Sequence, residues 1–174
     1  MKRTLSILCV ALCLLCSLGG CGSEELDYNN PDVSLFVKQL KGGNYKATDD
    51  KGVISVPHFA TKDIPALLTY VRDLTVIPSF PSVYNMNSGK IRLGECVLWI
   101  IESIRRGTPP SMGCKMVLAN AENYEPLYFL TDEEVLEAAD CYQRWWDERQ
   151  YPRTRWTIDP CYDDPLCGTG YRWW

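Results

Sequence analysis

The side chains that could serve as catalytic groups are few, and their spacing does not favour catalysis. His58 is the only histidine of the 174-residue chain. Its neighbours Pro57 and Phe59 favour a half-buried loop position, with the ring hydrogen-bonded to backbone, over a role as a general base. The Gly-x-Ser-x-Gly turn that positions a nucleophilic serine does not occur. A cysteine nucleophile would need His58 beside it in space, which the sequence does not indicate. We therefore expect no catalytic residues and no enzymatic activity.

Three pairs of adjacent acidic residues are the remaining candidates for acid–base chemistry. Glycoside hydrolysis needs two carboxylates that face each other across the scissile bond. Glu133-Glu134 is better explained as the start of a helix, and adjacent helical residues point in different directions. Asp49-Asp50 precedes Lys51-Gly52 and predicts a turn, and Asp163-Asp164 predicts a solvated turn rather than a calcium site. Hydrolysis of a polymer is therefore the least favoured function.

The first 21 residues have the pattern of a bacterial lipoprotein signal. Lys2 and Arg3 precede an apolar run, and Leu18-Gly19-Gly20 leads directly into Cys21. A transmembrane anchor is the alternative, but the apolar run is shorter than the ~20 residues that a spanning helix needs. We predict a signal peptide over 1–20, a lipid on Cys21, a tether over 21–30 and a single domain over 31–174.

Five of the nine cysteines follow Cys21, namely Cys96, Cys114, Cys141, Cys161 and Cys167. Outside the inner membrane, disulfides form and persist. Because five is an odd number, at least one thiol stays free. Cys161 and Cys167 are the best pair, since prolines and Gly168 mark tight turns around them. The spacings contain no Cys-x-x-Cys or Cys/His cluster, so we expect neither a metal nor a cofactor.

The charge of the chain argues against one class of partner. Its net charge is -4, and without Lys2 and Arg3 the 18 basic residues fall to 16 against 22 acidic ones. Nucleic-acid binding requires clustered basic side chains, so we exclude it. No polybasic patch attaches the domain to anionic lipid, and we expect attachment to the membrane through the lipid alone.

Apolar periodicity predicts four helices. The first starts near Pro31, capped by Asn30, and ends at Gly42-Gly43. The second starts at Thr61, the third covers residues 90–106, and the fourth runs from the capping box at Thr131 to Glu148. We predict a mainly α, compact four-helix domain, with HEAT-like packing of helix pairs as one form, long loops and an aromatic-rich C-terminal tail. Short strands at 53–56 and 127–130 would give the alternative, an α+β fold with a small sheet.

Aromatic residues are concentrated near the C-terminus, where adjacent tryptophans cannot all face one core. The ligand-binding candidates are Trp146, Trp156, Tyr171, Trp173 and Trp174. Exposed rings beside arginines can stack on sugars or contact a protein, whereas packed rings with arginines over them would be structural. Alanine at Trp156, Trp173 and Trp174 should weaken binding with little change in thermal stability, and a large stability loss would identify core residues.

Three segments of the chain form one pattern, namely 63–70 (DIPALLTY), 97–105 (VLWIIESIR) and 158–160 (IDP) with 168–173 (GTGYRW). Together they resemble an uncharacterised family of small Bacteroides-type lipoproteins with a domain of unknown function. The insertion from Cys161 to Cys167 interrupts the family pattern at the C-terminal end. Ser23-Glu24-Glu25 likewise resembles the export tag of surface-exposed lipoproteins in such bacteria. The resemblance implies an envelope lipoprotein with a compact helical domain, and it brings no catalytic residues.

The sequence therefore predicts a non-enzymatic outer-membrane lipoprotein, either surface-exposed or facing the periplasm. Its aromatic C-terminal face would bind a glycan or a protein. The alternative is a structural or accessory subunit of an envelope complex. A concave aromatic groove would favour the binding module, and a flat apolar patch would favour the subunit.

Overall fold

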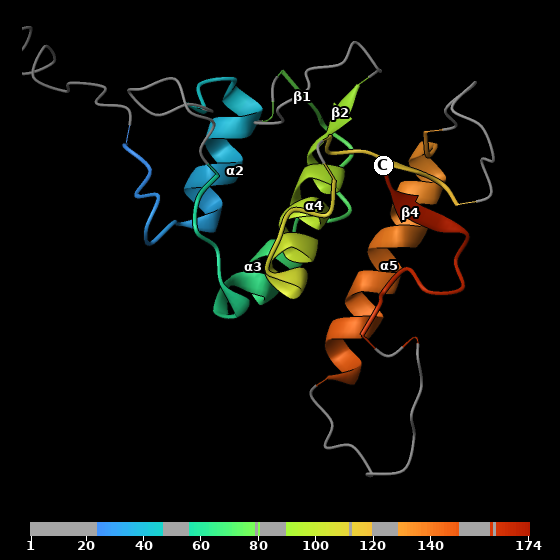
Figure 1. Ribbon diagram of the computed structural model, residues 1–174. Coiled ribbons are helices and arrows are strands. Elements are labelled where there is room, and N and C mark those ends of the chain that lie inside the picture. Colours follow the sequence, from blue (N-terminus) through green and yellow to red (C-terminus); the bar gives the residue numbers. More distant parts are fainter. Residues whose placement is uncertain are drawn as a thin grey trace, which may run out of the picture.

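Helices and two small antiparallel strand pairs build the part of the chain that the computed structural model describes, which is residues 24–46, 56–78, 80, 90–111, 113–119, 129–149, 161 and 163–174 (Figure 1). The elements are α2 (Val33–Gly42), the 3-10 turn η1 (Thr61–Asp63), α3 (Ile64–Leu68), β1 (Val76–Ile77), β2 (Ile91–Arg92), α4 (Leu93–Arg106), β3 (Met116–Leu118), α5 (Asp132–Glu148) and β4 (Tyr171–Trp173). The predicted signal peptide, Cys21 and Trp156 lie outside the described residues, as do most residues of the two predicted strands.

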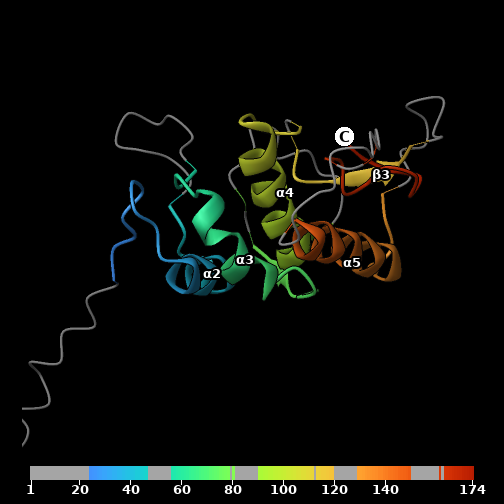
Figure 2. The ribbon, with the colours of Figure 1, turned by 90° about the horizontal axis from the view of Figure 1, so that it is seen from below.

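Helix α4 is the centre of the core. Figure 2 shows it between α3 and α5, with α2 beyond α3. All ten residues from Leu93 to Glu102 are buried, because neighbouring elements cover this helix on several sides. Its first free N–H groups are satisfied by the segment after α3, since Leu93 donates to the Thr75 carbonyl and Gly94 to the Asp73 carbonyl. Gly107, with φ 71°, ends the helix in the left-handed conformation that glycine adopts readily.

The predicted helix boundaries are correct at some ends and wrong at others. The capping box at Thr131 is confirmed, and α5 ends at Glu148 as predicted. The cap of α2 is Asp32 rather than Asn30, because the Asp32 carboxylate accepts a hydrogen bond from the Leu35 N–H at 2.7 Å. Residues 90–92 are not helical, because Ile91 and Arg92 pair with Ile77 and Val76 in an antiparallel ladder.

The strand pairs favour the alternative α+β class over a pure four-helix domain. β1 pairs with β2, and β3 pairs with β4 across a long stretch of sequence. Phe129, inside one predicted strand, forms only an isolated bridge to Val117. Helix α3 has only five residues, so it is too short to form one half of a HEAT-like helix pair. The fold is therefore rich in helix but completed by two small sheets.

Candidate functional site

The C-terminal aromatic candidates are half-buried rather than fully exposed. This description holds for Trp146, Tyr171, Trp173 and Trp174. Within the described residues, Val76 is the large hydrophobic side chain that is exposed, at 49%. Three of the four candidates lie on or beside β4, whose register places Trp173 opposite Met116. The tail therefore packs against the domain, and ligand binding by these rings stays a prediction.

A buried hydrogen-bond network uses the indole of Trp173. Its Nε1–H donates to the Tyr142 hydroxyl at 2.9 Å, and that hydroxyl donates to Glu102 Oε2 at 2.9 Å. Arg105 donates two hydrogen bonds to the same carboxylate, from Nε to Oε2 at 2.8 Å and from Nη2 to Oε1 at 2.6 Å. Burial raises the pKa of Tyr142 well above its usual value, so the hydroxyl remains protonated. This network attaches β4 to α4 and α5.

The other two β4-proximal rings also have partners inside the domain. The Tyr171 hydroxyl donates to Glu137 at 2.5 Å, and this hydrogen bond raises the pKa of Tyr171 to about 12. The Trp174 ring makes an edge-to-face contact with Phe129, with ring centroids 6.0 Å apart. It also lies against Gly113, where an added Cβ would come within 3.4 Å of the ring. These contacts hold the Tyr171 and Trp174 rings against the rest of the domain.

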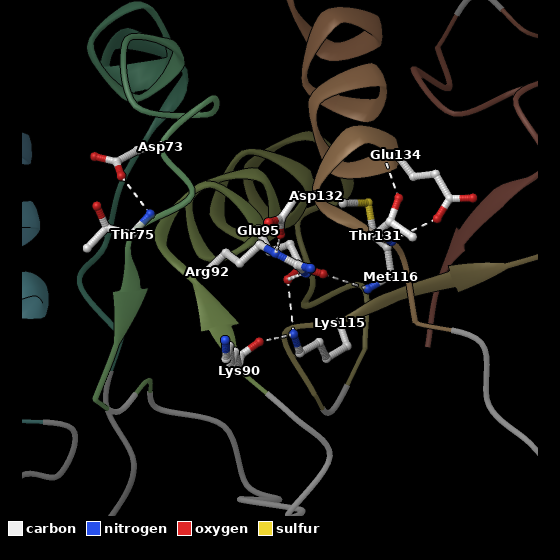
Figure 3. A network of polar contacts seen from close by, with 10 residues as sticks. All are labelled: Asp73, Thr75, Lys90, Arg92, Glu95, Lys115, Met116, Thr131, Asp132 and Glu134. Carbon is white, nitrogen blue, oxygen red and sulfur yellow. Dashed lines mark hydrogen bonds and ion pairs between the residues drawn. The ribbon is translucent and has the colours of Figure 1, made fainter.

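A second polar network surrounds Glu95, which is fully buried at the start of α4 (Figure 3). Its carboxylate forms ion pairs with Arg92 and Lys115, each at 3.0 Å, and accepts from the Met116 N–H at 3.5 Å. Lys115 is itself only 6% exposed, and its ammonium also donates to the Lys90 carbonyl. Because each charge has a partner, the network joins α4 to β3 rather than offering a free reactive group.

An apolar cavity of about 450 Å³ lies between the segment 56–61 and α4. Its walls come mainly from Val56, Phe59, Trp99, Ile100 and Ile104. Cavities of this size accommodate small molecules, and apolar walls with a few polar groups are typical of ligand sites. The Trp99 indole is held in place by a hydrogen bond from its Nε1–H to the Ser111 carbonyl at 3.2 Å.

Three polar residues, His58, Thr61 and Ser103, line this cavity. The prediction of a half-buried His58 is wrong: the side chain is exposed, because the chain is anchored here by the His58 backbone N–H, which donates to the Tyr28 carbonyl at 2.8 Å. The Ser103 hydroxyl donates to the Trp99 carbonyl at 2.7 Å, as helical serines often do. The polar groups of the cavity are thus the exposed His58 and Thr61 and the Ser103 hydroxyl, which is directed at backbone.

The structure also bears on the predicted disulfide, on metal binding and on membrane-spanning helices. Cys161 and Cys167 form a disulfide, as predicted, with Cα atoms 5.2 Å apart. In the described ranges, no three His, Cys, Asp or Glu side chains gather as a metal site would require. In those same ranges, no helix combines the length and apolar character that crossing a membrane demands.

The described residues form an α-rich α+β domain with an apolar cavity beside α4. Residues 27–174 match the family model described as Domain of unknown function (DUF4943), and the chain belongs to this family. No curated protein and no solved structure matches the chain.

Sequence reasoning missed the cavity and both buried carboxylates. Glu95 and Glu102 lie two helical turns apart, on the same face of an otherwise apolar helix. A charged residue at a core position needs a partner, so this spacing was a usable signal. The cavity had no such signal, because its two walls are about 40 residues apart in the sequence and both are ordinary apolar stretches.

Proposed function

We propose that this protein is a lipid-anchored, non-enzymatic binding module of the bacterial outer membrane, and that its ligand occupies the apolar cavity beside Trp99. Leu18-Gly19-Gly20-Cys21 supports the anchor. The observation that carries the binding function is the cavity of about 450 Å³ between residues 56–61 and α4. Its apolar walls favour a small, mainly apolar ligand, with one polar group placed at the exposed His58.

The chemistry of the cavity supports binding rather than catalysis. Ser103 directs its hydroxyl at the Trp99 carbonyl, so the hydroxyl proton is not shared with an imidazole base. The two buried carboxylates, Glu95 and Glu102, are each held by cationic partners. Neither carboxylate lines the cavity, so neither is placed to act on a ligand bound there.

A second candidate is docking of a protein partner on the C-terminal aromatic surface, formed by Trp146, Tyr171 and Trp174. These rings are half-buried, and Arg172, which follows Tyr171 in β4, is exposed. Aromatic and arginine side chains are enriched at the centres of protein interfaces. We place this candidate second, because Tyr171 and Trp174 already have partners within the domain.

The cavity is tested with the fluorescent probe 8-anilinonaphthalene-1-sulfonate, which has an apolar ring system and one anionic group. We expect saturable binding of one probe per chain, measured by fluorescence titration of the mature protein with Cys21→Ser. Ser103→Leu places added methyl groups among the cavity walls and should weaken probe binding about tenfold, which corresponds to about 1.4 kcal/mol.

Lys38→Leu is the matched control, because it adds the same side chain on α2 at a position whose side chain is 75% exposed. It should leave the probe affinity unchanged, and thermal unfolding should show that both variants are folded. Equal affinity of the unaltered protein and Ser103→Leu would show that the probe does not enter this cavity and would refute the proposed site.

A further inference from the structure

The free thiol of Cys141 and the Cys161–Cys167 disulfide lie in one surface depression. This depression has a volume of about 160 Å³ and is lined by all three cysteines, together with Arg144 and Thr169. Cys141 is on α5 and is half-buried, and Cys167 is exposed. Thiol–disulfide exchange requires access of the thiol to the disulfide, and the shared depression places these three cysteines on one small area of the surface.

Contacts within and after the disulfide loop hold this segment against the helices. Inside the loop, Asp163 pairs with Arg149, the C-cap of α5, at 2.5 Å, and the Asp163 carbonyl accepts from Arg105 of α4. After it, the Tyr171 hydroxyl bonds to Glu137, which precedes Cys141 by one turn of the same helix. The bridge itself closes a short loop with turn hydrogen bonds from Asp164 to the Cys161 carbonyl and from Cys167 to the Asp164 carbonyl. The segment therefore lies along the face of α5 that carries Cys141.

The Cys141 sulfur accepts a hydrogen bond from a cationic side chain at the protein surface. Arg144 Nη2 donates to Cys141 Sγ at 3.2 Å. This contact places a positive charge beside the sulfur that would attack the disulfide. Cys96 and Cys114 are fully enclosed in the core, and burial raises the pKa of both thiols. Reactivity is therefore expected at Cys141 alone.

We propose that Cys141 is a thiol–disulfide exchange site, at which its thiolate attacks one sulfur of the Cys161–Cys167 bridge. A new S–S bond forms between Cys141 and that sulfur, the original S–S bond breaks, and the other cysteine leaves as a thiolate. The proton that Cys141 releases neutralises this leaving group, so no external oxidant or reductant is consumed. The exchange converts a bridge that closes a seven-residue loop, Cys161 to Cys167, into one that ties the C-terminal segment to α5.

Peptide mapping tests this exchange directly, because trypsin separates the cysteines. Cleavage leaves Cys141 in Met116–Arg144 and both bridge cysteines in Trp156–Arg172, while Cys96 and Cys114 fall in Leu93–Arg105 and Gly107–Lys115. The mature chain is incubated at pH 8.5, blocked with N-ethylmaleimide and digested. We expect a linked pair of the Met116–Arg144 and Trp156–Arg172 peptides, with an equal amount of newly blocked Cys161 or Cys167. The rate should not depend on protein concentration, since the reaction is intramolecular.

Two variants identify the attacked sulfur. In Cys167→Ser and Cys161→Ser, oxidised glutathione supplies the oxidant, and Cys141 should become linked to the remaining bridge cysteine in at least one of them. Cys141→Ser is the control in which no linked pair can form, and Cys96 and Cys114 should appear in no link in any sample. The proposal is refuted if the unaltered chain yields no linked pair, or if both variants leave Cys141 fully available to the maleimide.

Discussion

At the scale of single residues, Trp173 shows how a tail that has the composition of a binding surface becomes part of the structure. Its indole completes a chain of hydrogen bonds through Tyr142 to Glu102, an acid only 3% exposed. The sequence-based expectation that Trp173 can be changed with little effect on stability does not fit this geometry. A buried hydroxyl that loses its donor is left with an unsatisfied acceptor position, which costs free energy.

We therefore predict that Trp173→Phe lowers the free energy of unfolding by about 1–2 kcal/mol. Phenylalanine keeps most of the apolar contact area but cannot donate to Tyr142. The measurement is urea denaturation followed by circular dichroism. Trp174→Phe is the control, because the Trp174 ring contributes an edge-to-face contact with Phe129 that a phenyl ring can also make. Equal losses in the two variants would show that the indole hydrogen bond contributes nothing.

At the scale of elements, the position of α4 depends on how closely its first turn approaches the segment after α3. The Gly94 N–H donates to the Asp73 carbonyl at 2.8 Å. A Cβ at Gly94 would lie 2.4 Å from the Val71 carbonyl oxygen and 3.1 Å from that of Asp73. Both obstacles are backbone atoms, so a side chain at this position would push the two elements apart.

Gly94→Ala should therefore destabilise the protein, although alanine is the better helix former by about 1 kcal/mol. We expect a net loss of about 1–3 kcal/mol, the range typical of overpacked cores. Gly113→Ala is the matched control, because its added Cβ meets the Trp174 ring at 3.4–3.5 Å, an ordinary contact distance. Urea denaturation of both variants measures the difference. A Gly94→Ala protein at least as stable as the unaltered one would contradict the close approach.

At the scale of the whole molecule, the domain and its attachment are separate questions. In the described residues, four helices and two strand pairs enclose one core cluster, to which the C-terminal strand contributes through Trp173 and Tyr171. The predicted anchor depends only on the residues that lead to Cys21. The domain is therefore expected to fold in the same way with or without the lipid.

We predict that Cys21 carries the lipid. Cells that express the protein and grow with an alkyne-tagged fatty acid should incorporate the tag into this chain, and Cys21→Ser should abolish the labelling. Protease treatment of intact and lysed cells then separates the two locations: cleavage on intact cells indicates surface display, and protection until lysis indicates the periplasm. Labelling that persists in Cys21→Ser would show that the lipid, if present, is attached elsewhere.

The sequence by itself determined the features that depend on neighbouring residues. The capping box at Thr131 predicted the start of α5, and the turn residues around Cys161 and Cys167 predicted the disulfide. The predicted end of the third helix at residue 106 is the observed end of α4. Each of these features is decided by interactions within a few residues, so the local sequence contains the whole signal.

Only the tertiary structure decided the features that join distant segments. Residues 91–92 form a strand because they pair with the backbone of residues 76–77. Likewise, β4 pairs with β3, which lies more than 50 residues earlier in the sequence. The cavity beside Trp99 and the depression shared by Cys141, Cys161 and Cys167 arise in the same way, from segments that only the fold brings together. Pairing across long loops depends on burial and on mutual satisfaction of polar groups, and a one-dimensional pattern does not contain that information.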